Sequence, residues 1–186
     1  MPDTENNLDA IREEYIHFPD EFNSVMLATI NADGTPDASY AVYIFHDSAY
    51  YIYISELAQH TENLMQSGTV SLLFIESEEK AQNQFARQRM TLQCSTSEVE
   101  RDCEHFNVVL DLFEHRYGPI AQMLRSLTDF HLFRIEPQSG TYVRGFAQAY
   151  KLYGEGLRQI RHINDKGHRA KDSETQRKMD DQISDI

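Results

Sequence analysis

Apolar and polar residues alternate at every second position over much of the middle of this chain, a pattern typical of strands with one buried face. The clearest case is the segment 84–99. Met90, Leu92 and Cys94 alternate there with polar residues, two of which are arginines that the pattern assigns to a solvated face. Runs rich in β-branched and aromatic residues predict further strands at 24–30, 37–45, 49–55 and 69–75, and a pair of strands within 129–150.

Turn residues indicate how the first strands are connected. Asp33 and Gly34 separate the first two, and this dipeptide is typical of a tight hairpin because glycine tolerates a positive φ. A second turn at 46–48 leads into the third strand, so we expect three consecutive antiparallel strands. The segment 69–75 is almost entirely apolar, which predicts a strand that is buried on both faces.

The segment 129–150 is predicted to form two strands joined by a turn at Pro137 and Gly140. Small residues on the second of these strands would let a ligand approach the backbone closely, and an arginine and aromatic residues beside them suit a flat, partly anionic ligand. The residues of this predicted wall are Arg144, Gly145, Phe146, Ala147, Gln148 and Tyr150.

A spacing of three and four residues between apolar positions predicts helices between the strands. The longest is predicted at 98–117 and is ended by Gly118 and Pro119. Shorter helices are predicted at 4–15, 56–67 and 120–127.

About seven short strands, one long helix and several short helices make an α+β domain, and a small closed barrel accounts for the regular alternation. The length of 186 residues fits one domain. We expect the chain to comprise an N-terminal helical segment (1–22), a barrel domain (23–153), a C-terminal segment (154–169) and a polar, flexible tail (170–186).

The net charge of −13 would repel a nucleic-acid backbone, although a few local arginines could still bind a small anion. No apolar run approaches the roughly 20 residues that a membrane span needs. Cys94 and Cys103 have neither metal-ligand nor redox spacing, so we expect a reduced, cytoplasmic protein.

The familiar phosphate-loop, HExxH, GxSxG and CxxC motifs are absent from the sequence. Two histidines remain of interest. By pattern alone, His60 occupies a half-buried helical position and His168 lies solvated in the polar tail, so periodicity does not make either one a ligand.

Seven short motifs nevertheless occur in an order and spacing that resemble one family. They are LATINADGTPDASYA, ISELAQHTENL, FARQRMTL, VERD, TDFHLFRIEP, GTYVRGFAQAY and GHR, and they span residues 26–169. The chain resembles the HutZ/HugZ-type bacterial heme-utilisation proteins, which degrade heme and belong to the FMN-binding split-barrel superfamily of pyridoxamine 5′-phosphate oxidase.

That resemblance implies a six-stranded split barrel and a homodimer that holds heme b near the subunit interface. His168 of the Gly-His-Arg motif matches the axial iron ligand, which makes 154–169 the ligand-bearing segment. Asp129 matches the aspartate that hydrogen-bonds this histidine from the neighbouring subunit, and a carboxylate there would fix its tautomer. His60 and Arg89 match pocket positions, and Arg89 could pair with a propionate or donate to bound oxygen.

Three functions follow from the resemblance. The first is oxygen-dependent heme degradation with electrons from an external donor. The second is an FMN-dependent oxidoreductase, in which Arg87, Arg89 and the region 55–63 would hold the phosphate. The third is a heme carrier or storage protein without catalysis, which needs the same iron ligand as the first.

Overall fold

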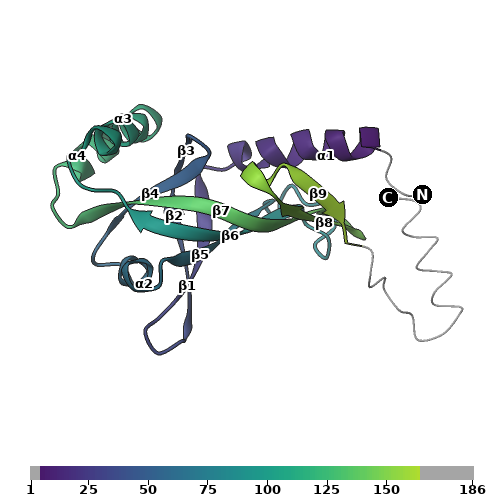
Figure 1. The fold of residues 1–186 in the computed structure, drawn as a ribbon, viewed down its shortest axis with the longest axis horizontal. Helices are drawn as coiled ribbons and strands as arrows, with labels where there is room; N and C mark the ends of the chain where they lie inside the picture. The colour runs from purple at the N-terminus through teal and green to yellow at the C-terminus, as the bar shows by residue number, and fades with distance from the viewer. Residues whose placement is uncertain (1–4, 164–186) are drawn as a thin grey trace, which may run out of the picture.

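The structure is a computed structural model that describes residues 5–163. Figure 1 shows a strongly twisted antiparallel sheet with helices around it. Its strands are β1 (Ser24–Ile30), β2 (Pro36–Val42), β3 (Ile44–His46), β4 (Ala49–Ser55), β5 (Thr69–Ile75), β6 (Arg89–Glu98), β7 (Phe130–Gly145), β8 (Gln148–Tyr153) and β9 (Gln159–His162). The α-helices are α1 (Glu5–His17), α2 (Gln59–Ser67), α3 (Glu104–Tyr117) and α4 (Pro119–Arg125), and two 3₁₀ turns are η1 (Phe18–Glu21) and η2 (Glu155–Leu157).

The strands follow the order β2-β1-β5-β6-β7-β4-β3, with β8 and β9 added beside the second half of β7. The two outermost strands of this path, β2 and β3, are separated in the chain by Tyr43 alone. Tyr43 is almost fully buried and its hydroxyl donates to the carbonyl of Pro19. The sheet therefore curls into a barrel at this bend. The α+β split barrel is confirmed. Residues 5–163 contain nine strands and not seven, because the predicted strand 37–45 is divided at Tyr43 and because β9 forms where no strand was predicted.

The predicted turn at Pro137 and Gly140 is wrong. β7 runs through both residues as one strand, with an irregular register where Pro137 faces Cys94 of β6. A Cβ atom at Gly140 would lie 2.7 Å from the Leu92 side chain, so this glycine makes room for a neighbouring strand and does not form a turn. The reversal occurs instead at Phe146 and Ala147, between β7 and β8.

Two other expectations need correction. In β5 only alternate residues are buried, because the strand is a wall of the barrel with one inner and one outer face. The long helix begins at Glu104 and not at Glu98, because β6 continues to Glu98, which pairs with Phe133 of β7. The Sγ atom of Cys103 then caps the helix by accepting the N–H of Phe106 at 3.3 Å.

The turn and helix-end residues behave as predicted. Gly34 has a φ of 85° in the β1–β2 hairpin, and Gly68 ends α2 in the left-handed conformation. Gly118 ends α3, as the glycine–proline pair indicates.

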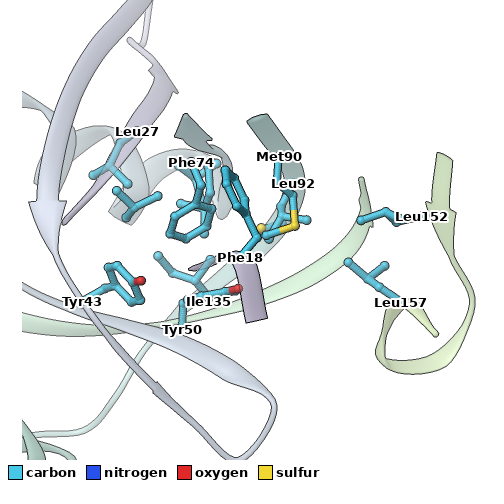
Figure 2. Packing of buried hydrophobic residues seen from close by; sticks show 14 of the residues in the cluster. Phe18, Leu27, Tyr43, Tyr50, Phe74, Met90, Leu92, Ile135, Leu152 and Leu157 are labelled. Atoms are coloured by element: carbon cyan, nitrogen blue, oxygen red, sulfur yellow. The ribbon is translucent and has the colours of Figure 1, made fainter. Parts of the chain in front are cut away.

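Buried residues form two clusters on opposite faces of the sheet. The inner cluster fills the barrel around Phe74, whose ring contacts those of Tyr43 and Tyr50 (Figure 2). The Phe74 ring also contacts that of Phe22. The outer cluster lies between the buried face of α3 and the outer face of β4 and β7; it comprises Ile44, Ala49, Tyr51, Tyr53, Phe106, Val109, Leu110, Phe113 and Leu132.

None of the helices that the structure describes has the length and apolar character needed to cross a bilayer. The region 154–163 contains η2 and β9, and β9 pairs with β8. The rest of the predicted ligand-bearing segment and the polar tail lie outside the described residues, so the domain limits stay predictions.

Candidate functional site

The predicted site residues fall into two groups at opposite ends of the barrel. Asp129 lies directly before β7 and beside the connection that leads into α2, the helix that carries His60, whereas Gly145 ends β7. Fifteen residue steps along β7 correspond to about 50 Å of strand. Figure 1 shows the same separation, with α2 and the start of β7 on one side and the β7–β8 hairpin on the other. His168 lies outside the described residues.

Asp129 is held where three segments meet. Its carboxylate accepts a hydrogen bond from the Ser55 hydroxyl at 3.2 Å, and its carbonyl accepts one from the N–H of Glu56 at 2.8 Å. Both partners belong to the end of β4 and the connection into α2. Asp129 remains partly exposed, so its carboxylate can accept a further hydrogen bond.

His60 is half-buried near the start of α2. Its Nδ1 atom lies 2.8 Å from the hydroxyl of Ser39 on β2, while its Nε2 atom is buried and has no hydrogen-bond partner among residues 5–163. Burial lowers the pKa of His60, and the nearby charge of Asp37 opposes this only in part. The imidazole is therefore neutral at pH 7 and has one ring nitrogen free to interact with a ligand.

Asn63 fixes the helix that carries His60. This side chain is almost fully buried, and it donates to Thr29 Oγ1 and Asn31 Oδ1, each at 2.9 Å. Ser39 was not among the predicted site residues, and Asn63 was included only in the region 55–63 of the FMN alternative. The signal that could have identified Asn63 is its polar side chain at a helical position that faces the sheet.

His131 is a further residue that the sequence analysis missed. Its Nδ1 lies 2.5 Å from Glu98 Oε1 and its Nε2 lies 2.7 Å from Glu56 Oε1, so both ring nitrogens face carboxylates. An imidazole that donates to two carboxylates must carry two protons. Burial lowers the pKa of His131, but the hydrogen bonds and charges of Glu98 and Glu56 outweigh it and raise the pKa. The three residues tie the connection into α2 to the end of β6.

The arrangement around His131 predicts that the contribution of this residue to the free energy of unfolding falls as the pH rises. Because the folded-state pKa of His131 is raised, its contribution is fully present below pH 6.5 and is lost as the pH rises through the raised value. Asp129 and the Arg101 side chain, which donates to the Phe130 carbonyl, are the other charged groups nearby. We expect the difference in unfolding free energy between wild type and His131→Gln, measured by urea denaturation, to shrink as pH rises from 6 to 9. A constant difference would contradict the charged clamp.

The other end of the barrel carries three arginines with different partners. Arg87 donates to the Glu76 carbonyl and has an ion pair with Glu78, and Arg144 pairs with Glu14 of α1 at 3.0 Å. The guanidinium of Arg89 donates to the carbonyl of Arg87 but has no carboxylate partner within the described chain.

Arg89 begins β6 between Ile75 of β5 and Val143 of β7. Since Met90 beside it points into the core, Arg89 points to the outer face of the barrel. A partly buried guanidinium in this position can bind an anionic group of a ligand or of a partner chain.

The predicted wall is a hairpin end in the structure and not the middle of a strand. Gly145 ends β7, and Phe146 and Ala147 form the turn, where Ala147 has a positive φ of 59°. A Cβ atom at Gly145 would meet nothing closer than 4.0 Å. Arg144, Gly145 and Phe146 therefore lie at the same end as Arg89, and one chain does not bring this group together with His60 and Asp129.

The fold and the sequence together define the class of this protein. The family model described as pyridoxamine 5′-phosphate oxidase matches residues 11–144, and the chain belongs to this family. Within it, the resemblance to the HutZ-type heme-utilisation proteins is confirmed. The chain is 38% identical over 159 residues to a protein named heme oxygenase HutZ from Vibrio cholerae, covering 86% of this chain and 90% of that one.

Solved structures agree with this assignment. A crystal structure of Vibrio cholerae HutZ, described there as a heme storage protein, superposes with a TM-score of 0.68 at 36% identity, covering 72% of this chain and 94% of that chain. The crystal structure of Campylobacter jejuni ChuZ gives a TM-score of 0.78 at 33% identity, covering 88% of this chain and 66% of that chain.

Proposed function

We propose that this protein binds heme b and degrades it with oxygen and electrons from an external donor, releasing iron. The observation that carries the proposal is the similarity, over most of both chains, to a protein named heme oxygenase. A cytoplasmic location remains a prediction from the two cysteines.

A homodimer with a composite site accounts for the separation of the two groups. His60 and Asp129 of one subunit would meet Arg89, Arg144, Gly145, Phe146 and the ligand-bearing segment of the other. The outer face of the barrel supports this arrangement, because Met26 (50% exposed) lies between Tyr40 (70% exposed) and Leu73 on neighbouring strands. Apolar side chains grouped on an exposed sheet face are typical of a protein interface.

The residues present fit heme. The guanidinium of Arg89 lacks a carboxylate partner in residues 5–163, and a propionate would supply one. The buried Nε2 of His60 has no protein partner there, so it can interact with the ligand or with a water beside it. Arg144 has a carboxylate partner already, which makes it the weaker candidate for an anionic group.

Each residue has a distinct role in this proposal. Heme, when bound, supplies the oxygen chemistry. His168 would hold the iron as a neutral imidazole, and Asp129 would accept the proton on the other ring nitrogen, which fixes the tautomer and raises the basicity of the ligand. Arg89 would orient the macrocycle, and neutral His60 would accept or donate a hydrogen bond within the site.

Two alternatives share the same fold. An FMN-dependent oxidoreductase is consistent with the pyridoxamine 5′-phosphate oxidase family, and Arg87 and Arg89 would then hold the phosphate. A heme carrier without catalysis is consistent with the description of one HutZ structure as a storage protein.

A hemin titration tests the proposal. The purified protein should give a Soret band that saturates at one heme per subunit, and His168→Ala should abolish or shift that band because the iron loses its ligand. His115→Ala, which changes an exposed histidine on α3, should leave the titration unchanged. Incubation with ascorbate and oxygen should then bleach the band.

Each outcome separates the three functions. Intact heme after this incubation would favour the carrier. Fluorescence of flavin released on denaturation, without a Soret band on hemin addition, would favour the FMN-dependent oxidoreductase. If the His168→Ala protein bound hemin as the wild type does, His168 would not be the iron ligand.

A further inference from the structure

The VERD motif, residues 99–102, contains none of the candidate site residues. It connects β6 to α3, and it is fixed at both ends. At one end the Val99 N–H donates to the Leu132 carbonyl of β7 at 2.8 Å, and at the other end Cys103 caps α3. The motif therefore holds the side chain of Arg101 beside the start of β7.

Arg101 directs its positive charge at the main chain. This residue is partly buried, and its Nη2 group donates to the carbonyl oxygens of Leu127 at 3.1 Å and Phe130 at 2.5 Å. The guanidinium also lies over the ring of Phe106 on α3, 5.5 Å from the ring centroid. Arg101 has no ion pair with a carboxylate in the described chain. Its contacts therefore act on the course of the segment that contains both carbonyls.

The two carbonyls flank Asp129. Residues 126–129 connect the end of α4 to the start of β7, and residues 126–128 are exposed (Figure 1). Because an exposed connection has few contacts of its own, hydrogen bonds from other elements decide its conformation. Leu127 lies two residues before Asp129, and Phe130 follows it directly. One nitrogen of Arg101 thus links both sides of Asp129.

The contacts from β4 do not fix the carboxylate by themselves. The Glu56 N–H holds the carbonyl of Asp129, and the ring of Tyr53 lies 5.2 Å from that of Phe130. The carboxylate itself receives the Ser55 hydroxyl at 3.2 Å, which is long for a hydroxyl donor. Since the main chain before Asp129 is held from β4 by none of these bonds, its direction depends on Arg101.

We propose that Arg101 is a positioning residue for heme degradation: its bonds to the Leu127 and Phe130 carbonyls hold the Asp129 carboxylate where it meets His168 of the partner subunit. The inference rests on the proposed function, which gives Asp129 that task. A hydrogen bond weakens steeply with distance and angle, so a small shift of Asp129 would weaken its bond to the iron ligand. That ligand would then lose basicity and a fixed orientation.

Amide hydrogen exchange in the heme-free full chain tests the positioning itself. The Glu56 N–H, which donates to the Asp129 carbonyl, should exchange about tenfold faster in Arg101→Gln, because glutamine is too short to reach both carbonyls. The Thr96 N–H, which donates to the Gly68 carbonyl at 2.8 Å, should exchange at its wild-type rate. Equal acceleration at both amides would indicate a general loss of stability and would overturn the proposal.

The heme-loaded protein offers a spectroscopic readout. The iron–histidine stretching frequency of the ferrous protein falls when the imidazole loses its bond to a carboxylate. Arg101→Gln should lower this frequency as Asp129→Asn does, and it should slow heme degradation about tenfold while one heme per subunit still binds. The double variant should resemble Asp129→Asn alone, because Arg101 acts through Asp129. Losses of activity that multiply in the double variant would contradict this.

Arg116→Gln is the matched control. Arg116 also donates to a backbone carbonyl, that of Phe22 at 2.7 Å, and also lies over aromatic rings. It belongs to the last turn of α3, whose 14 residues span about 20 Å, whereas Arg101 precedes the first turn. The control should leave the Glu56 exchange rate and the stretching frequency unchanged. The same changes in both variants would overturn the proposal.

Arg101→Lys keeps a cationic donor and should show smaller effects of the same sign, so it replaces Arg101→Gln if that variant does not fold. Unchanged Glu56 exchange in both variants would overturn the proposal. If the wild-type protein bound no hemin, the proposed function would fail. Faster Glu56 exchange in the heme-free variant would still support the positioning of Asp129 by Arg101.

Discussion

A heterodimer of two impaired variants, Asp129→Asn and Arg89→Ala, should regain about half of the wild-type rate of heme degradation. The two residues lie at opposite ends of one chain, so a composite site would take one from each subunit. In the heterodimer, one of the two sites receives the intact Arg89 of the Asp129→Asn chain and the intact Asp129 of the Arg89→Ala chain. The other site receives both changes.

The experiment requires two affinity tags, co-expression and tandem purification of the heterodimer. As a homodimer, Asp129→Asn should lose about 10- to 100-fold in activity because the iron ligand loses its carboxylate partner. The Arg89→Ala homodimer should also be impaired. Circular dichroism and light scattering should show that both variants fold and assemble as the wild type does.

The matched control pairs two variants from the same end of the barrel. A heterodimer of Asp129→Asn and His60→Ala has one change in each site, so its activity should stay as low as that of its parents. Equal activity of the two heterodimers would contradict the composite site. If light scattering showed that the wild-type protein is a monomer, the proposed homodimer would be contradicted.

Gly140→Val should lower the free energy of unfolding by about 3 kcal/mol. This is the largest loss of stability that we expect from adding a side chain to β7. A Cβ atom there would lie 2.7 Å from Leu92 Cδ2 and 2.9 Å from the Thr91 carbonyl oxygen. The leucine can shift only by disturbing the core, and the carbonyl belongs to the β6 backbone, which is held by its pairing with β7. Thermal and urea denaturation measure the effect.

Gly145→Ala is the matched control on the same strand. A Cβ atom there has no neighbour closer than 4.0 Å, so the unfolding free energy should change by less than about 0.5 kcal/mol. The same variant tests whether Gly145 contacts heme, because an added methyl group would then weaken hemin binding without affecting stability. Equal destabilisation by both changes would show that the close contacts at Gly140 are not the cause.

Much of the fold was predictable because local chemistry decides it. A hairpin at Gly34 and helix ends at Gly68 and Gly118 depend on backbone conformations that glycine adopts without strain, and these predictions are confirmed. The alternation in β6 depends on the period of a strand, which is the same in any barrel wall.

The wrong predictions share a different cause. Pro137 and Gly140 resemble a turn locally, but β7 continues through them because β6 pairs along its length and Leu92 needs the space above Gly140. The start of α3 was placed too early because residues up to Glu98 pair with β7, and a contact between distant segments leaves no periodic signal.

The sequence by itself determined the family and the residues that match its motifs, because the order and spacing of short motifs can be recognised without knowledge of the fold. The tertiary structure decided where Asp129, His60 and Arg89 lie. Residues 129–150, which the sequence presents as one wall for a ligand, are spread along a single long strand, with Asp129 just before its start and Gly145 at its end. The physical reason is that a strand extends by about 3.3 Å per residue. Because no turn interrupts β7, residues at its two ends lie at opposite ends of the barrel.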